Sequence, residues 1–312
     1  MVLAELLGFV AASLVMVKSG DYAVKSVTAI GKNLNIGHFV VSFFLVGLVT
    51  ALPEGSISAI SALKGVPALG FGTLIGSVIA DALLVIGLVA IVARRTVIEK
   101  ALTYELWMFG LMALLFALAM DGVISRIDGA ILAGGCIFFF FSLMKQNHIM
   151  DHLVHSDRKH LARQALIFMA SAAVVIASAN YVVKFSQNIA AYFGVPLVVM
   201  GVIFLALATS LPEMVLAIAA ASKKMANIAI GELFGVIMID GALLIGMVAI
   251  ISPIAVPAAE ATKLAIFVLT SLALVSYFIR SDRALTWKEG IFLVFFYILF
   301  VATELTIARP LT

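Results

Sequence analysis

The sequence has few charged residues: 12% of its 312 residues are Asp, Glu, Lys or Arg, whereas 64% are apolar. A soluble globular domain carries about 25% charged residues. A soluble chain of this size cannot hide so much apolar surface from water, so the composition predicts that most of it faces lipid. The net charge of +3 is small and the basic residues form short, scattered clusters, which argues against nucleic-acid binding.

Cysteine is almost absent as well. The single Cys136 lies inside an apolar run at 131–143 and has no partner for an intramolecular disulfide. We therefore expect it to be a small buried residue and not a redox or metal group. Residues 1–17 lack the basic segment and the cleavage site of a signal peptide, so we expect a retained first helix there.

Long apolar stretches dominate what is present. A helix needs about 20 mostly apolar residues to cross a bilayer. Ten stretches approach this length, at residues 2–19, 38–62, 70–93, 102–120, 128–144, 165–191, 197–221, 228–251, 262–279 and 289–308. The sequence thus predicts an all-α integral membrane protein with ten transmembrane helices.

The basic residues predict how these spans are oriented, because Lys and Arg concentrate in cytoplasmic loops. With the N-terminus outside, the cytoplasmic links and adjoining helix ends hold 15 of the 20 basic residues. The opposite side holds Lys64, Arg126, Lys184, Lys263 and Arg309. We expect a multi-pass protein of the plasma (inner) membrane with both termini outside and the link 145–164 in the cytoplasm.

An internal repeat divides the chain. A shift of 159 residues places TALPE (50–54) on TSLPE (209–213), and Asp81 on Asp240. We expect a first five-helix repeat at 1–144, the link at 145–164 and a second five-helix repeat at 165–312. Because each half has an odd number of spans, the second half enters the membrane from the other side, which predicts two inverted repeats.

Four acidic residues lie inside the expected spans: Glu54, Asp81, Glu213 and Asp240. An ionised side chain at the bilayer centre costs at least about 2.5–3.5 kcal/mol. We expect the four carboxylates to face one another around a polar cavity, where cations or protons neutralise them. A buried acid that stays protonated and only joins two helices is the simpler alternative, but it does not explain two related pairs.

Proline and hydroxyl residues accompany the acids. Pro53 and Pro212 precede the two glutamates and should kink each helix, freeing carbonyls around 47–49 and 206–208 for a cation. Four further residues offer hydroxyl ligands near the acids: Thr50, Thr209, Ser210 and Ser77. Alternatively, each hydroxyl only bonds to a carbonyl of its own helix. Clustered carboxylate, hydroxyl and carbonyl oxygens are the ligands that Ca2+ prefers.

The segments TALPEGSISAISALKG…GTLIGSVIAD and TSLPEMVLAIAAASKK…GELFGVIMID resemble the paired alpha repeats of the cation/Ca2+ exchanger superfamily. They are most similar to those of prokaryotic Na+/Ca2+ exchangers, with alpha motifs at 47–87 and 206–246. The resemblance implies a Ca2+/Na+ antiporter with Glu54 and Glu213 as central Ca2+ ligands. It also implies that the ion sites are lined by Asp240, Thr50, Thr209, Ser210, Ser77 and the carbonyls of Gly47 and Ala206.

Several positions depart from the family pattern, including Thr73 and Glu232, which stand where the family has the asparagine of a Gly-Asn pair. Ala51 and Val236 stand where the family has serine, and Asp81 stands where similar exchangers have asparagine. Relative to the family pattern, the expected metal site thus lacks two hydroxyl ligands and has one additional carboxylate. We expect a weakened flanking Na+ site and protons held on Asp81 and Asp240.

The expected function is secondary active exchange of Ca2+ for Na+ by alternating access. The alternatives are an H+/Ca2+ antiporter, an intramembrane aspartyl protease using Asp81 and Asp240, and a channel. The protease lacks a GxGD motif, and paired inverted repeats favour occlusion over a continuous pore. We expect no enzyme activity, no cofactor besides the transported Ca2+, Na+ and H+, and no partner beyond inorganic cations and the lipid bilayer.

The link at 145–164 is rich in histidine, with His148, His152, His155 and His160 beside Asp151. The i,i+4 spacing of the first two would suit a transition metal. A solvated cytoplasmic loop is the simpler interpretation, since polar links are hydrophilic without any ligand.

Overall fold

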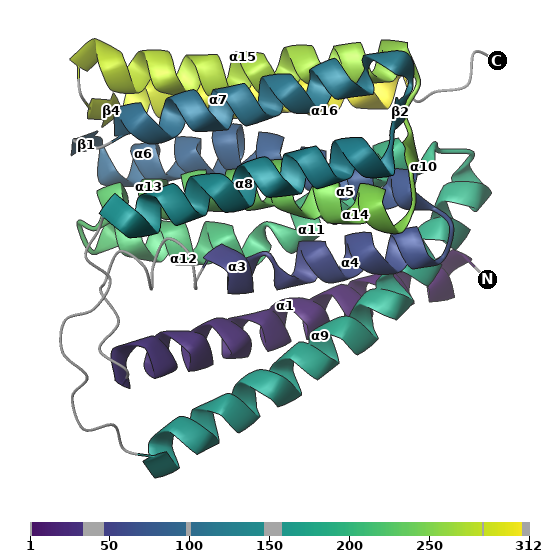
Figure 1. The fold of residues 1–312 in the computed structure, drawn as a ribbon, viewed down its shortest axis with the longest axis horizontal. Helices are drawn as coiled ribbons and strands as arrows, with labels where there is room; N and C mark the ends of the chain where they lie inside the picture. The colour runs from purple at the N-terminus through teal and green to yellow at the C-terminus, as the bar shows by residue number, and fades with distance from the viewer. Residues whose placement is uncertain (1, 34–46, 98–100, 147–157, 283, 308–312) are drawn as a thin grey trace.

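The computed structural model describes residues 2–33, 47–97, 101–146, 158–282 and 284–307, nearly all of them helical (Figure 1). The first part contains α1 (Val2–Asn33), α3 (Gly47–Thr50), α4 (Leu52–Leu63), α5 (Pro67–Ile79), η2 (Ala80–Val85), α6 (Ile86–Ala93), β1 (Arg95–Val97), α7 (Ala101–Leu118), η3 (Ala119–Asp121), β2 (Val123–Ile124) and α8 (Arg126–Gln146).

The second part contains α9 (Arg158–Phe193), α10 (Leu197–Val199), η4 (Met200–Leu205), α11 (Ala206–Thr209), α12 (Leu211–Ser222), α13 (Ala226–Met238), η5 (Ile239–Leu244), α14 (Ile245–Ile251), β3 (Ile254–Ala255), α15 (Ala258–Asp282), β4 (Ala284–Thr286) and α16 (Trp287–Ile307). Three of the η segments, η2, η4 and η5, are π-helical, and η3 is a 3-10 turn.

Six helices of the described chain are long and apolar enough to cross a membrane, judged by length and composition. A seventh is added if the bent pair Leu197–Thr209 and Leu211–Ser222 forms one span. The predicted stretches are helical almost throughout wherever they fall within the described residues, whereas 38–46 lies outside them. The prediction of a helical membrane protein is confirmed, and the count of ten spans stays a prediction.

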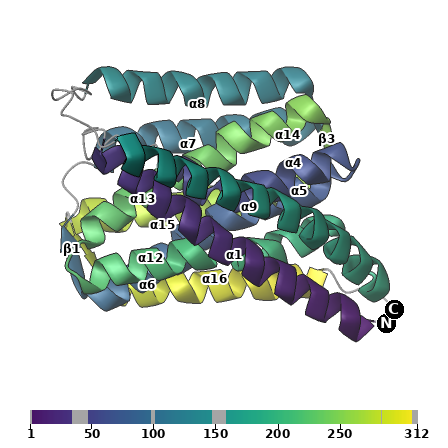
Figure 2. The ribbon, with the colours of Figure 1, turned by 90° about the horizontal axis from the view of Figure 1, so that it is seen from below.

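Helices α1 and α9 are longer than the predicted stretches at 2–19 and 165–191. The boundary predicted at 19 is too early because charged residues continue the helix: Asp21 and Lys25 form an ion pair one turn apart. The two long helices pack along each other on one side of the bundle (Figures 1 and 2).

The core has separate parts. The main cluster joins α5, α6, α7, α8, α13, α14, α15 and α16, and among the described residues none of its members comes from α1 or α9. These two helices pack through smaller clusters that include Met16, Val175 and Val182. The outer surface is apolar, with Phe138 and Phe295 each 61% exposed, as expected for side chains that face lipid.

Two short antiparallel strand pairs correct the purely α-helical prediction. β1 pairs with β4, with Arg95 opposite Thr286, and β2 pairs with β3, with Val123 opposite Ala255. The two pairs lie at opposite ends of the bundle (Figures 1 and 2). Such strands of two or three residues are too short to show an alternating pattern in the sequence.

The helix boundaries repeat at the same offset as the sequence. Both bounds of α4 and α12 are 159 positions apart, as are those of α3 and α11, α5 and α13, and η2 and η5. The turns that follow α4 and α12 also correspond. Gly65 and Lys224, which are 159 positions apart, both have positive φ, at 73° and 62°. The repeat seen in the sequence therefore extends to the backbone around the four acids.

Glycines let α5 approach α10 and η4 closely. A Cβ added at Gly72 would lie 2.4 Å from the Val198 carbonyl oxygen, and one at Gly201 would lie 2.5 Å from the Leu69 carbonyl oxygen. Small residues commonly allow such close helix packing in membrane proteins. At Gly231, the repeat equivalent of Gly72, no described atom lies within 4 Å of an added Cβ, so no such close approach is seen there in the described chain.

We predict that Gly76→Ala destabilises the protein. The new Cβ would lie 2.2 Å from the Val202 carbonyl oxygen and 2.6 Å from Ala206 Cβ, so α5 and η4 must separate. Overpacking of this kind typically costs about 1–3 kcal/mol. The measurement is Tm in detergent, with Gly110→Ala as control because no atom lies within 4 Å there. Equal Tm values for the two variants would contradict the close approach.

Candidate cation site

Four carboxylates are buried at the middle of the bundle, as predicted. Glu54 lies on α4, Asp81 on η2, Glu213 on α12 and Asp240 on η5. Their exposed fractions are 1%, 0%, 5% and 0%, in that order. Glu213 interacts electrostatically with the other three, and Glu54 with both aspartates, so the two halves bring their acids into one region.

A helix break places each glutamate. α3 ends at Thr50 and α4 begins at Leu52, with ψ of 2° at the intervening Ala51. The corresponding break in the second half lies at Ser210, where ψ is −1° and the axis bends by 42°. Proline occupies the second position of α4 and of α12, where its missing N–H is tolerated. The predicted breaks are confirmed, and each sets a glutamate in a first helical turn.

The carbonyls next to the breaks differ from the expectation. The Gly47 oxygen accepts hydrogen bonds from the Ala51 N–H (3.1 Å) and the Thr50 hydroxyl (3.0 Å). The Ala206 oxygen likewise accepts from the Ser210 N–H (2.9 Å) and the Thr209 hydroxyl (3.2 Å). In this conformation both carbonyls are therefore engaged by their own helices.

The positions of the two prolines show which backbone carbonyls lose their helical hydrogen-bond donor. The residues four positions before Pro53 and Pro212 are Val49 and Ala208, whose helical partners have no N–H. Both lie at the edge of the ranges predicted from the sequence. The i−4 rule alone would have singled them out ahead of Gly47 and Ala206.

Both aspartates lie in π-helical segments, a feature that the sequence analysis missed. η2 contains Asp81 and η5 contains Asp240, at equivalent positions of the repeat. Single π-helical turns are rare and frequently occur at functional sites. No residue pattern in either segment indicates the extra residue per turn, so these π-helical turns can be recognised only from the structure.

A pair of hydroxyls joins the two halves. The Ser77 and Ser210 oxygens lie 3.2 Å apart, and both residues are buried. Ser210 lies beside the Asp81 carboxylate and Ser77 beside that of Asp240. Thr209 lies beside Glu54, although its hydroxyl donates to the Leu205 carbonyl at 3.0 Å. An oxygen that donates its proton to a backbone carbonyl keeps lone pairs for a cation.

The repeat counterparts of this serine pair are apolar. Ala51 corresponds to Ser210 and Val236 to Ser77 at the 159-residue offset, and the two are 3% and 1% exposed. Val236 also approaches Gly47, since a Cβ added at Gly47 would lie 3.8 Å from its Cγ2. One pair of equivalent positions thus supplies two hydroxyls, and the other supplies only methyl groups.

The eight oxygens of the four carboxylates are buried and have no hydrogen-bond partner among the described residues. Leaving a buried charge without a partner is strongly unfavourable. Within the described ranges no three acidic, histidine or cysteine side chains form a ready metal cluster, so a cation needs hydroxyl or carbonyl oxygens as well. The donor set is one of hard oxygens, which suits Ca2+ and Na+.

Two other predicted features lie elsewhere. Cys136 is fully buried in α8, as expected, and its thiol lies 3.5 Å from the Met238 carbonyl oxygen. Most of the histidine-rich link lies outside the described residues, including Asp151, His148, His152 and His155. His160 is described and lies on the exposed surface of α9.

Comparison with known proteins identifies a family. The model of a family described as sodium/calcium exchanger protein matches residues 4–145 and 163–306. Inner membrane protein YrbG of Escherichia coli is 28% identical over 252 residues, which cover 77% of this chain and 78% of that protein.

Solved structures resemble the fold along almost the whole chain. The sodium-calcium exchanger NCX_Mj, soaked with Na+ and Sr2+, has a TM-score of 0.70 at 22% identity and covers 97% of this chain and 99% of that one. The H+/Ca2+ exchanger CAX has a TM-score of 0.79 at 16% identity and covers 97% of this chain and 87% of that one. At these identities the likeness establishes the fold.

We predict that Glu54→Gln and Glu213→Gln each weaken Ca2+ binding by roughly 10- to 100-fold. Each change removes one charged oxygen ligand, worth about 1.5–3 kcal/mol, while keeping the side-chain shape. The measurement is equilibrium binding of radioactive Ca2+ to purified protein. Glu5→Gln is the control, because Glu5 bonds only to Asn188 at the surface in this structure. Folded variants with wild-type affinity would refute the central placement of the two glutamates.

Proposed function

The chain belongs to the sodium/calcium exchanger protein family, and from that premise we propose that it exchanges Ca2+ for Na+ by alternating access. Members of this family are transporters and not enzymes, so the aspartyl protease alternative is set aside. The observation that carries the proposal is the set of eight buried carboxylate oxygens without partners. A low-dielectric site with this charge needs cations at every stage of a transport cycle.

Ca2+ binds between Glu54 and Glu213 in this proposal. The two are repeat equivalents in the first turns of α4 and α12, directly after the helix breaks. Their carboxylates supply two negative charges, which one Ca2+ neutralises. Thr50, Thr209 and the carbonyls of Val49 and Ala208 add oxygens from the neighbouring turns, giving a coordination number within the range that Ca2+ takes.

Na+ and H+ occupy the flanking positions. The oxygens available there belong to two aspartates and two serines: Asp81, Asp240, Ser77 and Ser210. Up to two negative charges remain once Ca2+ is bound, and Na+ or protons neutralise them. H+/Ca2+ exchange is the second candidate, because Asp81 adds a carboxylate where similar Na+/Ca2+ exchangers carry an amide.

Ten spans in two inverted repeats, 1–144 and 165–312, form the architecture of this transporter. Four observations support it: the 159-residue offset of the helix bounds, the two segments matched by one family model, the strand pairs at opposite ends, and the paired glycine contacts. In these contacts a Cβ on Gly87 would lie 2.9 Å from the Gly290 oxygen, and one on Gly246 would lie 2.6 Å from the Gly129 oxygen.

The end that carries β1 and β4 faces the cytoplasm. Arg94 and Arg95 lie in or beside β1, and Lys223 and Lys224 lie in the turn between α12 and α13 at the same end (Figure 1). Clusters of this kind favour the cytoplasmic side. The first described residue of α1 and the last of α16 lie at the opposite end, which supports a topology with both termini outside.

Helices α1 and α9 switch the exposure of the site. They contact each other extensively and touch the broken helices through α3, α4, α11 and α12. Their packing clusters are separate from the main core in the described part of the chain. Sliding this pair therefore leaves the main core intact, which suits a moving element beside a fixed site.

We predict that an outward Na+ gradient drives Ca2+ uptake into proteoliposomes at equal pH on both sides. The wild-type rate should fall as the pH is lowered, because protonation removes carboxylate charge. Asp81→Asn should flatten this pH dependence and leave Ca2+ binding detectable, whereas Asp21→Asn, on the surface of α1, should not change it. Uptake that requires a pH gradient and ignores Na+ would favour the H+/Ca2+ exchanger.

A second prediction concerns topology. In a Cys136→Ala background, His155→Cys should react with a membrane-impermeant maleimide only from the cytoplasmic side. Thr312→Cys should react only from the outside. Labelling of both positions from one side would contradict the inverted arrangement of five plus five spans.

A further inference from the structure

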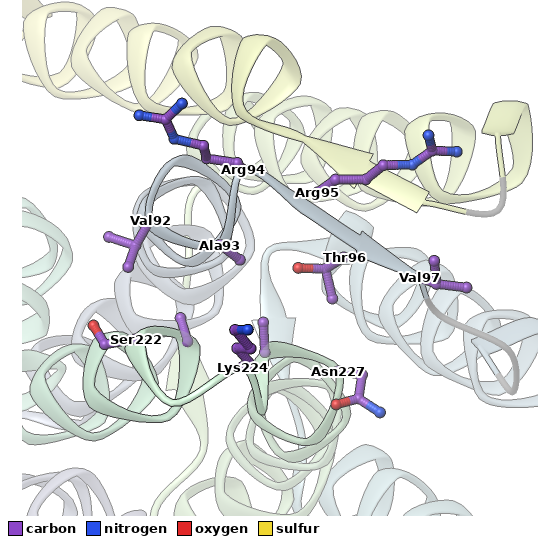
Figure 3. Close-up of a pocket in the computed structure, with 11 residues that line it drawn as sticks. Val92, Ala93, Arg94, Arg95, Thr96, Val97, Ser222, Lys224 and Asn227 are labelled. Atoms are coloured by element: carbon purple, nitrogen blue, oxygen red, sulfur yellow. The ribbon is translucent and has the colours of Figure 1, made fainter.

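A pocket of about 580 Å³ opens at the end of the bundle that carries β1 and β4, away from the buried carboxylates. Its walls come from the end of α6, strand β1, the end of α12 and the start of α13 (Figure 3). The first two elements belong to the first half of the chain and the other two to the second half. Nothing in the exchange mechanism uses this pocket.

The charged residues that line the pocket are all positive. Its described lining contains Arg94, Arg95 and Lys224 and no acidic residue. Lys224 lies across from strand β1, while the two arginine side chains are directed away from the ring of lining residues (Figure 3). Arg94 and Lys224 both have φ of 62°, a conformation uncommon for residues other than glycine. The pocket therefore presents the positive charge of Lys224, with two further cations on residues of its wall.

A buried hydroxyl in the wall lacks a partner. Thr96 is 6% exposed, and its Oγ1 has no hydrogen-bond partner among the described residues. Figure 3 shows this hydroxyl directed toward the middle of the ring of lining residues. An unsatisfied buried hydroxyl costs about 1–3 kcal/mol, so a ligand that accepts its proton would remove an existing penalty.

The N-terminus of α13 supplies the third feature. This 13-residue helix begins at Ala226, and its N-cap Met225 provides no side-chain hydrogen bond. Ala226 and Asn227 both line the pocket, so the positive end of the helix dipole is directed at it. The first N–H groups of a helix are natural donors to an anion.

We propose that this pocket binds a phosphate-bearing anion, held by Lys224, Thr96 and the first turn of α13. Its volume exceeds that of a single small ion, and Val92, Val97 and Ala221 give it apolar walls. Phosphate accepts several hydrogen bonds at once, which suits the lysine, the hydroxyl and the helix N–H groups gathered here.

The surroundings place the pocket at the level of lipid headgroups. Trp287 follows β4 directly, its backbone N–H donates to the Arg94 carbonyl at 3.0 Å, and the residue is 45% exposed. Exposed tryptophan is typical of the membrane interface. The phosphate has two possible sources, an anionic phospholipid or a soluble phosphate compound, and both present the same chemistry to Lys224 and Thr96.

A bound anion would connect the two halves of the chain. One anion would bridge β1, which follows the α5–α6 segment with Asp81, and the α12–α13 turn, which lies between Glu213 on α12 and Asp240 on η5. A ligand that binds only the folded state raises its stability in proportion to occupancy. Thermal stability is therefore a direct readout that does not depend on transport.

The experiment measures the Tm of the full-length protein in neutral detergent while a ligand is titrated. The probes are dioctanoyl phosphatidylglycerol, dioctanoyl phosphatidylcholine as the zwitterionic control, inorganic phosphate and ATP. The variants are Lys224→Asn, which tolerates positive φ, and Thr96→Val, which keeps the side-chain shape. Lys223→Asn is the matched control, because it removes the same charge from the adjacent residue, which does not line the pocket.

Phosphatidylglycerol should raise the Tm of the wild type and phosphatidylcholine should not. Lys224→Asn and Thr96→Val should each weaken the apparent affinity by roughly tenfold, the loss expected for one bond to a charged group, and Lys223→Asn should keep it. The Tm of Thr96→Val without ligand should not fall, because the variant removes an unpartnered hydroxyl. A rise produced by phosphate or ATP and dependent on Lys224 would support the site with a soluble ligand.

Three results would overturn the proposal. The first is the absence of a Tm rise with any of the anions. The second is an equal loss of affinity in Lys223→Asn and Lys224→Asn, which would indicate general surface charge. The third is a lower Tm of ligand-free Thr96→Val with an unchanged response to the anions, which would give Thr96 a purely structural role.

Discussion

Mutual repulsion among four buried carboxylates is the constraint on which the rest of this structure depends. Glu54, Asp81, Glu213 and Asp240 are at most 5% exposed, and their oxygens have no hydrogen-bond partner in the described chain. In a medium of low dielectric constant such a group is stable only with cations or protons beside it. In the proposed exchanger, cations or protons on these carboxylates would therefore stabilise the bundle as well as take part in transport.

The helix breaks follow from that requirement. A regular helix satisfies all its own carbonyls, so it has few oxygens to offer an ion. Proline at the second position of α4 and α12 removes a donor and leaves the carbonyls of Val49 and Ala208 without their helical partners. The same break sets each glutamate in a first helical turn, where the helix dipole stabilises its negative charge. Carboxylate and free carbonyl thus arise from one Leu-Pro-Glu element, used twice.

Sequence reasoning was most successful where the chemistry is local. The Pro53 and Pro212 breaks, the burial of the four acids and the 159-residue repeat all depend on residues close in sequence or on one simple offset. It missed the π-helical turns at Asp81 and Asp240 and the pairing of β1 with β4, because these depend on packing between distant segments. The end predicted for α1 at residue 19 is too early because the helix continues through charged residues, where it packs against α9 and where Asp21 and Lys25 pair one turn apart.

The two halves are chemically unequal at one pair of positions, and this bears on the coupling ion. Ser77 and Ser210 lie 3.2 Å apart beside the aspartates, whereas their repeat counterparts Val236 and Ala51 carry no side-chain oxygen. A Na+ ion needs several oxygens at once, but a proton needs only one carboxylate. Both aspartates lie beside the hydroxyl-bearing pair, so in the proposed exchanger this side would bind Na+ and the methyl-bearing side would not. A proton on Asp81 or Asp240 would remove charge from the same group of oxygens, so Na+ and H+ would compete there.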